Sequence, residues 1–379
     1  GETANSWDVV LMGVALLFSL AAGLQIKILN THHRVNTLAK WGILNSIFGT
    51  LASLLCIWFW GAPGIAASVI AATIINWLIS RYFVSREVPV QNVQVSRPEL
   101  FSAAKELLRF GTPFTASMLF GMGVQFILPV LILNTLDQES VGFYRAAVAI
   151  SVGYLGFLLT AMAQDYYPRI SAITDKSKLK ETVNQQHKLI LLLGVPMIFG
   201  AFALSPYLVT LVYSPEFSPA VGVLEWQLLG NLFQFSSWTM SFVILSHCKS
   251  RTYFFTEVAG GLSMLLCSWF AMQVWGLTGL GVGFLLSYVA YFLVVWLINL
   301  SRFKITLSAN NWVMLLSAFF LALSIQALPL VGLQDWRIPL SLGIAFIFGF
   351  RTLFSLYKIV RKKDPSEEVP LILKQGEHA

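Results

Sequence analysis

Long runs of apolar residues, separated by short polar segments, recur along the whole chain. A helix that crosses the hydrocarbon core of a bilayer needs about 20 mostly apolar residues, whereas runs of about 10 to 14 are typical of buried helices in soluble proteins. Eleven runs reach the required length, so the pattern predicts eleven membrane-spanning helices. The predicted helices are Val9 to Leu29, Gly42 to Trp60, Ile65 to Tyr82, Phe110 to Leu133, Val141 to Tyr166, Leu189 to Tyr213, Val221 to Leu245, Phe254 to Val274, Leu277 to Leu300, Trp312 to Leu330 and Ile338 to Ile359.

The composition agrees with this pattern. Hydrophobic residues make up 56% of the 379 residues and charged residues 11%, and the mean hydropathy is +0.72. A soluble domain carries about 25% charged residues and could not bury so much apolar surface. We therefore predict an all-α, polytopic transmembrane helix bundle and not a soluble enzyme.

The formal net charge of +7 is distributed unevenly between the loops. If successive loops alternate sides, 22 of the 25 Lys and Arg residues lie on one side of the membrane, and only Arg145, Arg337 and Arg351 fall elsewhere. Loops rich in Lys and Arg remain in the cytoplasm, so eleven spans place the N-terminus outside and the C-terminal tail inside. Topology thus accounts for the basic charge, and no nucleic acid is expected as a partner.

Two parts of the chain resemble each other at an offset of about 215 residues. The segment Leu54 to Phe59 parallels Leu265 to Phe270, and each is followed by a Gly-x-x-Gly turn, at Gly61 to Gly64 and at Gly276 to Gly279. The offset of six helices gives both units the same orientation, and hence a pseudo-twofold axis along the membrane normal. Three further helices precede the later unit but not the earlier one. We therefore expect two six-helix lobes, of which the first lacks its opening three helices, as in a fragment or a partial reading frame.

The repeat divides the chain into five expected parts. A basic, proline-containing linker joins the lobes, and its stretch from Glu99 to Arg109 is amphipathic, which indicates either a helix at the inner membrane interface or a solvated loop. The same two interpretations apply to Thr174 to Lys188. The expected parts are the remainder of the N-terminal lobe at 1–82, a cytoplasmic linker at 83–109, a six-helix lobe at 110–300, two additional spanning helices at 301–359 and a cytoplasmic tail at 360–379.

Polar residues inside the predicted spans are candidate functional positions, because burying them in a membrane costs free energy unless they are paired or hydrated. Five residues of the seventh predicted helix recur at spacings of four, three, four and three, which places them on one face. They are Gln227, Asn231, Gln234, Trp238 and Ser241. Such a stripe faces either another helix, with which it forms hydrogen bonds, or an aqueous cavity. Gln125 is a comparable polar residue of the fourth predicted helix.

Three ionisable residues near the ends of spans each admit a functional and a structural interpretation. Arg145, in the fifth predicted helix, suits either bidentate binding of a phosphate or extension to the outer headgroups. Glu225 and Glu257 suit either a proton or cation site for coupling, or a helix N-terminus, where an acid is favoured electrostatically. The cysteines and histidines show no ligand spacing, and no catalytic motif occurs. We therefore expect no metal, no cofactor and no catalytic residue.

Six short motifs follow one another along the chain. They are Leu108 to Pro113, Val141 to Ala147, Tyr167 to Ser171, Tyr213 to Phe217, Trp226 to Gly230 and Thr256 to Val258. In order and spacing they resemble polysaccharide flippases of the multidrug/oligosaccharidyl-lipid/polysaccharide exporter superfamily, and in particular Wzx-type O-antigen translocases. The resemblance covers nearly all of Ser6 to Arg302 and begins at what would be the family's fourth helix.

The resemblance implies two lobes around a central hydrophilic cavity that opens alternately to either face of a bacterial cytoplasmic (inner) membrane. The implied substrate is an undecaprenyl-diphosphate-linked sugar, with membrane lipids and other polysaccharide assembly proteins as further partners. Arg145 is then a candidate diphosphate contact, because its helix corresponds to one that borders the family's cavity. Gln125, Gln227, Asn231 and Gln234 are the other candidate substrate contacts.

Two other functions remain open from the sequence. A drug or small-molecule antiporter of the same superfamily would export cationic dyes. A membrane-embedded sugar polymerase or ligase would yield polymerised glycan, although the short predicted outer loops leave little room for such chemistry. Neither the carried sugar nor the coupling ion follows from the residues.

Overall fold

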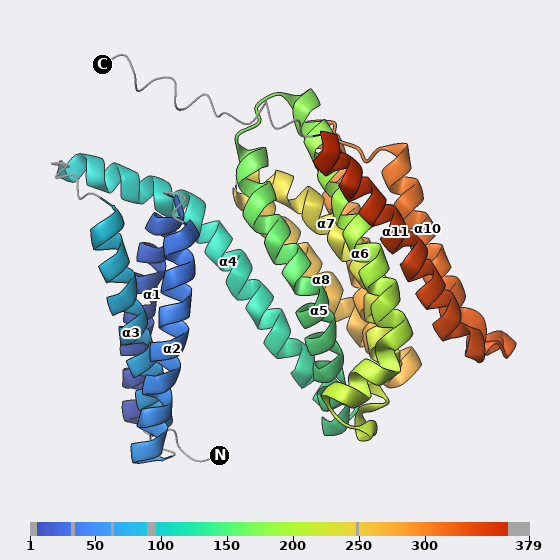
Figure 1. Ribbon diagram of the computed structural model, residues 1–379, viewed down its shortest axis with the longest axis horizontal. Coiled ribbons are helices and arrows are strands. Elements are labelled where there is room, and N and C mark those ends of the chain that lie inside the picture. Colours follow the sequence, from blue (N-terminus) through green and yellow to red (C-terminus); the bar gives the residue numbers. More distant parts are fainter. Residues whose placement is uncertain (1–5, 32–34, 62–63, 89–95, 248–249, 363–379) are drawn as a thin grey trace. The chain divides into compact units, whose positions relative to one another are not determined.

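The computed structural model describes residues 6–31, 35–61, 64–88, 96–247 and 250–362. Within these ranges the chain forms eleven α-helices, joined by short turns and 3₁₀ or π segments, and no β-strand (Figure 1). Each predicted span overlaps one of these helices, so the prediction of an all-α bundle is confirmed. The helices are α1 (Ser6–Thr31), α2 (Val35–Trp60), α3 (Gly64–Glu87), α4 (Arg97–Thr135), α5 (Gln138–Ser171), α6 (Lys176–Val212), α7 (Ala220–His247), α8 (Ser250–Trp275), α9 (Gly279–Ile298), α10 (Ala309–Ala327) and α11 (Arg337–Lys362).

Ten helical stretches in the described part of the chain are long and apolar enough to cross a membrane. One of them, Ser250–Phe303, contains both α8 and α9, which a 3₁₀ turn at Gly276–Thr278 separates. The difference from the eleven predicted spans is therefore only in how this stretch is divided. The chain is a multi-pass helical membrane protein.

Two spanning helices extend well beyond their apolar runs. α4 begins at Arg97 and includes the amphipathic segment from Glu99 to Arg109, whose side chains are exposed. α6 begins at Lys176 and so includes most of the second such segment; the side chain of Asp175 caps it by accepting a backbone hydrogen bond. Both segments are therefore helical and continuous with a span. Residues 89–95 of the expected linker and 363–379 of the expected tail lie outside the described residues.

The helices form two compact units, Gly1–Leu100 and Phe101–Ala379. In the first unit, α3 packs against both α1 and α2, which contact each other much less. Ser80 Oγ of α3 donates a hydrogen bond to Gln25 Oε1 of α1 at 2.6 Å, which ties these two helices together through polar groups.

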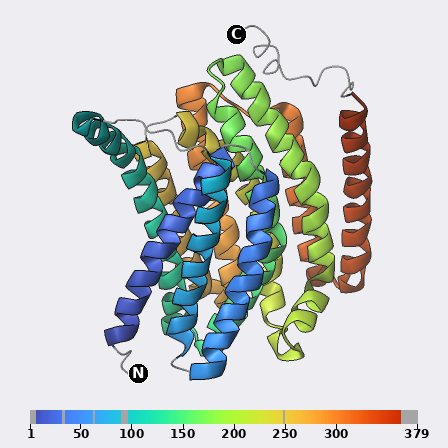
Figure 2. The same cartoon turned by 60° about the vertical axis from the view of Figure 1, so that its left-hand side comes forward.

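α7 lies at the centre of the second unit, where it contacts α5, α6, α8, α9 and α10. α4 packs on α8, where the rings of Phe114 and Tyr253 stack with their centroids 6.1 Å apart. α11 runs along α6, as the red and yellow-green ribbons of Figure 2 show. The last two helices are thus packed onto the same body as α7.

The sequence repeat is accompanied by a repeat of local structure. In the second unit α9 packs against both α7 and α8, which contact each other much less, as α3 does with α1 and α2 in the first. Gly61 and Gly276 follow equivalent helices and both have a left-handed backbone, with φ of 60° and 54°. A Cβ atom on Gly64 or on Gly279 would collide with a carbonyl oxygen of the preceding helix. Each Gly-x-x-Gly turn therefore needs its first glycine for conformation and its last for close approach.

Prolines interrupt the hydrogen bonding of α4 and α6, because a proline has no N–H for the carbonyl four residues earlier. In a membrane such a carbonyl must find another donor. For Pro113, Pro196 and Pro206 that donor is a hydroxyl group of a nearby serine or threonine. The donor and acceptor pairs are Ser250 with the Arg109 carbonyl, Thr352 with the Leu192 carbonyl and Ser205 with the Phe202 carbonyl. The second of these pairs also fastens α11 to α6.

Candidate functional site

The polar stripe predicted from Gln227 to Ser241 runs along α7 and is largely buried. The exposed fraction is 0% for Gln227 and 1% for Asn231. This burial follows from the position of α7, which five other helices contact. In this structure the stripe therefore faces neighbouring helices, which is the first of the two interpretations of its sequence pattern.

Asn231 and Gln234 join three helices in a chain of hydrogen bonds. Ser151 Oγ of α5 donates to Asn231 Oδ1 at 3.0 Å, and Asn231 Nδ2 donates to Gln234 Oε1 at 2.7 Å. Gln234 Nε2 then donates to the hydroxyl group of Tyr288 on α9 at 2.8 Å. These partners offset the cost of burying amide groups in an apolar bundle.

Gln227 differs from the other two amides of the stripe, because neither atom of its amide has a hydrogen-bond partner within the described residues. Buried amide groups without a partner are uncommon and destabilising. The Gln227 amide therefore keeps an unused donor and an unused acceptor near the N-terminal end of α7.

Glu257 lies beside a hollow of about 90 Å³ where α7, α8 and α9 meet. Tyr291 of α9 donates a hydrogen bond from its hydroxyl group to Glu257 Oε1 at 2.5 Å, and Ser241 Oγ lies 3.1 Å from the same hydroxyl oxygen. The hollow is lined by Trp238, Ser241, Phe242, Tyr253, Glu257 and Tyr291. The C-terminal end of the predicted stripe therefore lies next to one of the two predicted coupling carboxylates.

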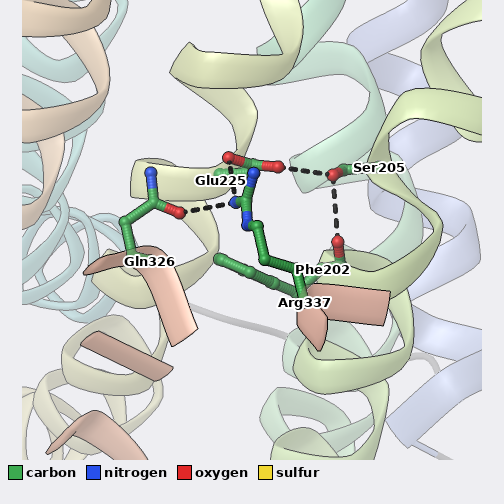
Figure 3. A network of polar contacts seen from close by, with 5 residues as sticks. All are labelled: Phe202, Ser205, Glu225, Gln326 and Arg337. Carbon is green, nitrogen blue, oxygen red and sulfur yellow. Dashed lines mark hydrogen bonds and ion pairs between the residues drawn. The ribbon is translucent and has the colours of Figure 1, made fainter. Parts of the chain in front are cut away.

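Glu225 belongs to a separate polar cluster that joins α6, α7, α10 and α11 (Figure 3). Arg337 donates from Nη2 to Glu225 Oε2 at 2.7 Å and to Gln326 Oε1 at 2.9 Å. Ser205 Oγ lies 3.0 Å from the other carboxylate oxygen, Oε1. The Arg337 guanidinium also lies over the ring of Phe202, 5.3 Å from its centroid. The carboxylate of Glu225 is therefore neutralised by an arginine of the same chain.

Arg145 on α5 and Gln125 on α4 both have exposed side chains. Neither forms a hydrogen bond or an ion pair with another described residue. Tyr144, Ala146 and Ala147 are buried against the core, whereas Arg145 lies on an outward side of α5. An unpaired guanidinium with free donors is suited to bidentate binding of a phosphate oxygen pair.

A hydrogen bond joins only one pair of the predicted site residues, Asn231 with Gln234. Glu225 and Glu257 occupy separate clusters, and Tyr288 and Tyr291, which complete the contacts of the stripe, were missed by sequence reasoning. Tyrosines in membrane sequences are usually interpreted as interfacial anchors. Their spacing of three residues, which matches the spacing within the stripe, is the signal that would have found them.

The fold is shared with solved helical membrane transporters. One is the lipid II flippase MurJ in its inward closed conformation, with a TM-score of 0.59 and 15% identity over 94% of this chain and 75% of that chain. Another is the crystal structure of a mutant MATE protein, with a TM-score of 0.61 and 17% identity over 77% of this chain and 68% of that chain. At these identities the likeness concerns the fold alone.

A family model described as "Polysaccharide biosynthesis protein" matches residues 8–222, more than half of the chain. The chain belongs to this family. The match, together with the shared fold, confirms the resemblance to the polysaccharide flippases of the exporter superfamily.

Two curated relatives have related descriptions. The lipid III flippase of Escherichia coli (strain K12) is 21% identical over 154 residues, which are 41% of this chain and 37% of the relative. A putative O-antigen transporter of Shigella flexneri is 23% identical over 217 residues, which are 57% of this chain and 51% of the relative. The chain thus spans between 37% and 51% of the length of these relatives.

Proposed function

We propose that the protein is a flippase that carries an undecaprenyl-diphosphate-linked oligosaccharide, an O-antigen or a related repeat unit, across a bacterial cytoplasmic membrane by alternating access. The observation that carries the proposal is the line of hydrogen-bonded polar side chains on α7, at the centre of an otherwise apolar bundle. Stability in lipid alone would favour apolar and small residues there. The descriptions of the two relatives support a lipid-linked sugar as the class of substrate.

The candidate contacts divide by chemistry into two groups. The exposed guanidinium of Arg145 suits the diphosphate, whereas the amides of Gln125, Gln227, Asn231 and Gln234 suit sugar hydroxyl groups. Because the α7 amides are buried here, they bind sugar only in a second conformation of the cycle. In that conformation sugar hydroxyl groups replace the side chains that bond the amides here. The amides therefore keep their hydrogen bonds while a route for the sugar opens through the bundle.

Glu257 is better suited than Glu225 to couple transport to the binding of an ion. Glu225 is held by Arg337, and its protonation would leave a partly buried arginine without a counter-charge. Glu257 borders a hollow and has hydroxyl partners but no cationic one among the residues that line it. A carboxylate in such a position can gain and lose charge during a transport cycle.

The distribution of Lys and Arg supports an inner-membrane location with the C-terminal tail in the cytoplasm. Transport in this scheme requires no covalent chemistry, so the protein acts as a carrier and not as an enzyme. Its partners are membrane lipids, the lipid-linked sugar and the other proteins that assemble the polysaccharide.

The test is a transport assay on the purified protein in liposomes that contain an undecaprenyl-diphosphate-linked sugar. Sugar that crosses to the outer leaflet is detected with an added lectin. We expect Arg145→Ala to lower the initial rate at least about tenfold, because one charge-assisted contact to phosphate contributes about 1.5 to 3 kcal/mol. Arg351→Ala removes an equal charge from the exposed face of α11 and should retain the rate.

Three results would contradict the proposal. Export of cationic dyes without movement of the lipid-linked sugar would favour a drug antiporter. Polymerised glycan with no crossing of repeat units would favour a polymerase or ligase. Equal rates for the two arginine variants would remove Arg145 from the substrate site.

A further inference from the structure

The hydrogen bonds around Glu257 have a defined direction. What they imply for coupling rests on the proposed flippase function. Tyr291 has a single hydroxyl hydrogen, which it donates to Glu257 Oε1. The contact between Ser241 Oγ and the Tyr291 oxygen therefore has Ser241 as its donor. Two hydroxyl groups, one from α7 and one from α9, are thus aligned toward one oxygen of a carboxylate on α8.

The hollow beside Glu257 is lined by a single charged group. Among the six residues that line the hollow, Glu257 alone carries a charged group, while α7 contributes the ring of Trp238 and the hydroxyl of Ser241. The titratable neighbours are tyrosines. Tyr253 on α8 also hydrogen-bonds the Glu257 carboxylate, and α9 contributes Tyr288 and Tyr291. From α4, Phe114 stacks on Tyr253 and adds an uncharged ring. No side chain that lines the hollow can therefore neutralise the carboxylate by an ion pair.

An ionised carboxylate that is partly withdrawn from water costs free energy unless a cation or a proton neutralises it. A hard metal cation needs several oxygen lone pairs directed at it. Here the hydrogen of Tyr291 points at the carboxylate, and its oxygen already accepts from Ser241. A metal ion would have to break this arrangement, whereas a proton needs only one lone pair of the carboxylate.

We propose that Glu257 is the proton-binding site that couples transport, and that Tyr291 is the residue that positions its carboxylate. The hollow of about 90 Å³ is large enough for water molecules, which need at least about 10 to 15 Å³ each. Binding transfers one proton from a hydronium ion in the hollow to Glu257: one O–H bond of the hydronium ion breaks, one O–H bond to the carboxylate forms, and a water molecule is left. The positive charge of the hydronium ion and the negative charge of the carboxylate are removed together, and release reverses the same step.

Protonation also changes what Tyr291 and Ser241 can do. A protonated carboxyl group is a weaker acceptor than a carboxylate, so the bond from Tyr291 weakens when Glu257 gains its proton. Ser241 belongs to the same stripe of α7 as Gln234, and Gln234 bonds Tyr288, which precedes Tyr291 by three residues on α9. The carboxyl group is therefore connected through α7 and α9 to the amides proposed to bind sugar.

The direct test is infrared difference spectroscopy of the purified protein as a function of pH, without any substrate. We expect a carbonyl band of a protonated carboxylic acid that is lost in Glu257→Gln. Tyr291→Phe should displace the midpoint of that band by about one pH unit, since it removes a hydrogen bond of roughly 1 to 2 kcal/mol from a charged group. Tyr288→Phe removes the neighbouring hydroxyl, which bonds Gln234 instead, and should leave the midpoint in place.

A change of salt distinguishes coupling to protons from coupling to sodium ions. Replacing choline chloride with sodium chloride should leave the midpoint unchanged, and a sodium-dependent displacement that Glu257→Gln abolishes would overturn the proposal. A band that persists in Glu257→Gln would also overturn it. Because the measurement needs no transport, a titrating Glu257 in a protein that fails to move lipid-linked sugar would refute the flippase function while leaving the proton site intact.

Discussion

Arg337 and Glu225 lie 112 residues apart in the sequence and form an ion pair in which Nη2 is 2.7 Å from Oε2. Arg337 is one of three bases that break the charge asymmetry of the loops. The pair explains this exception, because the arginine is neutralised locally and the side chain of Glu225 is only 6% exposed. The pair also connects the start of α11 to α7.

Removing Arg337 should destabilise the protein, because it leaves a buried carboxylate without its counter-charge. We expect Arg337→Ala to lower the free energy of unfolding in detergent by about 3 kcal/mol, the usual effect of breaking a buried pair. Thermal denaturation monitored by fluorescence is a suitable measurement, with the exposed Arg351→Ala as the matched control. The double variant Arg337→Ala with Glu225→Ala should regain part of the loss; equal stabilities of the single variants and the parent would argue against the pair.

Gly281 should not tolerate a methyl group. A Cβ atom at this position would lie 2.5 Å from the carbonyl oxygen of Val223, so alanine would push α9 away from α7. We expect Gly281→Ala to cost about 1 to 3 kcal/mol of stability. Gly153→Ala on α5 meets nothing within 4 Å and should have a melting temperature close to that of the parent. A similar melting temperature for both variants would contradict the close packing of α7 and α9.

The two Gly-x-x-Gly turns should respond alike to substitution. Gly61→Ala and Gly276→Ala each force a side chain into the left-handed region, at a cost of about 1 to 2 kcal/mol. The melting temperatures of both variants, compared with that of Gly153→Ala, check this expectation. Strain at only one of the two turns would mean that the equivalence of α2–α3 with α8–α9 does not extend to energetics.

Asp137 should make the start of α5 sensitive to acid. Its carboxylate accepts the backbone N–H of Ser140 at 2.7 Å, and this bond lowers the pKa of Asp137 below its ordinary value of 3.8. A group whose pKa is lowered by folding stabilises the folded state above its unfolded pKa and loses that contribution as the pH falls through the folded value. Hydrogen exchange of the Ser140 amide should therefore accelerate in acid, after correction for the intrinsic rate. Asp137→Asn, which caps without titrating, should show no such acceleration.

The apolar runs predicted every helix, because the length of a bilayer crossing is a strong physical constraint on sequence. The ends were less accurate, since polar helical extensions such as Glu99 to Arg109 carry no membrane signal. The stripe on α7 followed from its spacing, but its partners did not. Whether Gln234 bonds Tyr288, or Glu225 bonds Arg337, depends on how distant helices pack, and one sequence does not encode that in any local pattern.

The central position of α7 limits how this protein can be altered. A replacement on α7 is in contact with several other helices at once, so even a conservative change has to be accommodated by α5, α6 and α9 together. Mutagenesis libraries that aim to alter the proposed glycan preference should therefore start from the exposed faces of α4 and α5, around Gln125 and Arg145, whose side chains are not buried.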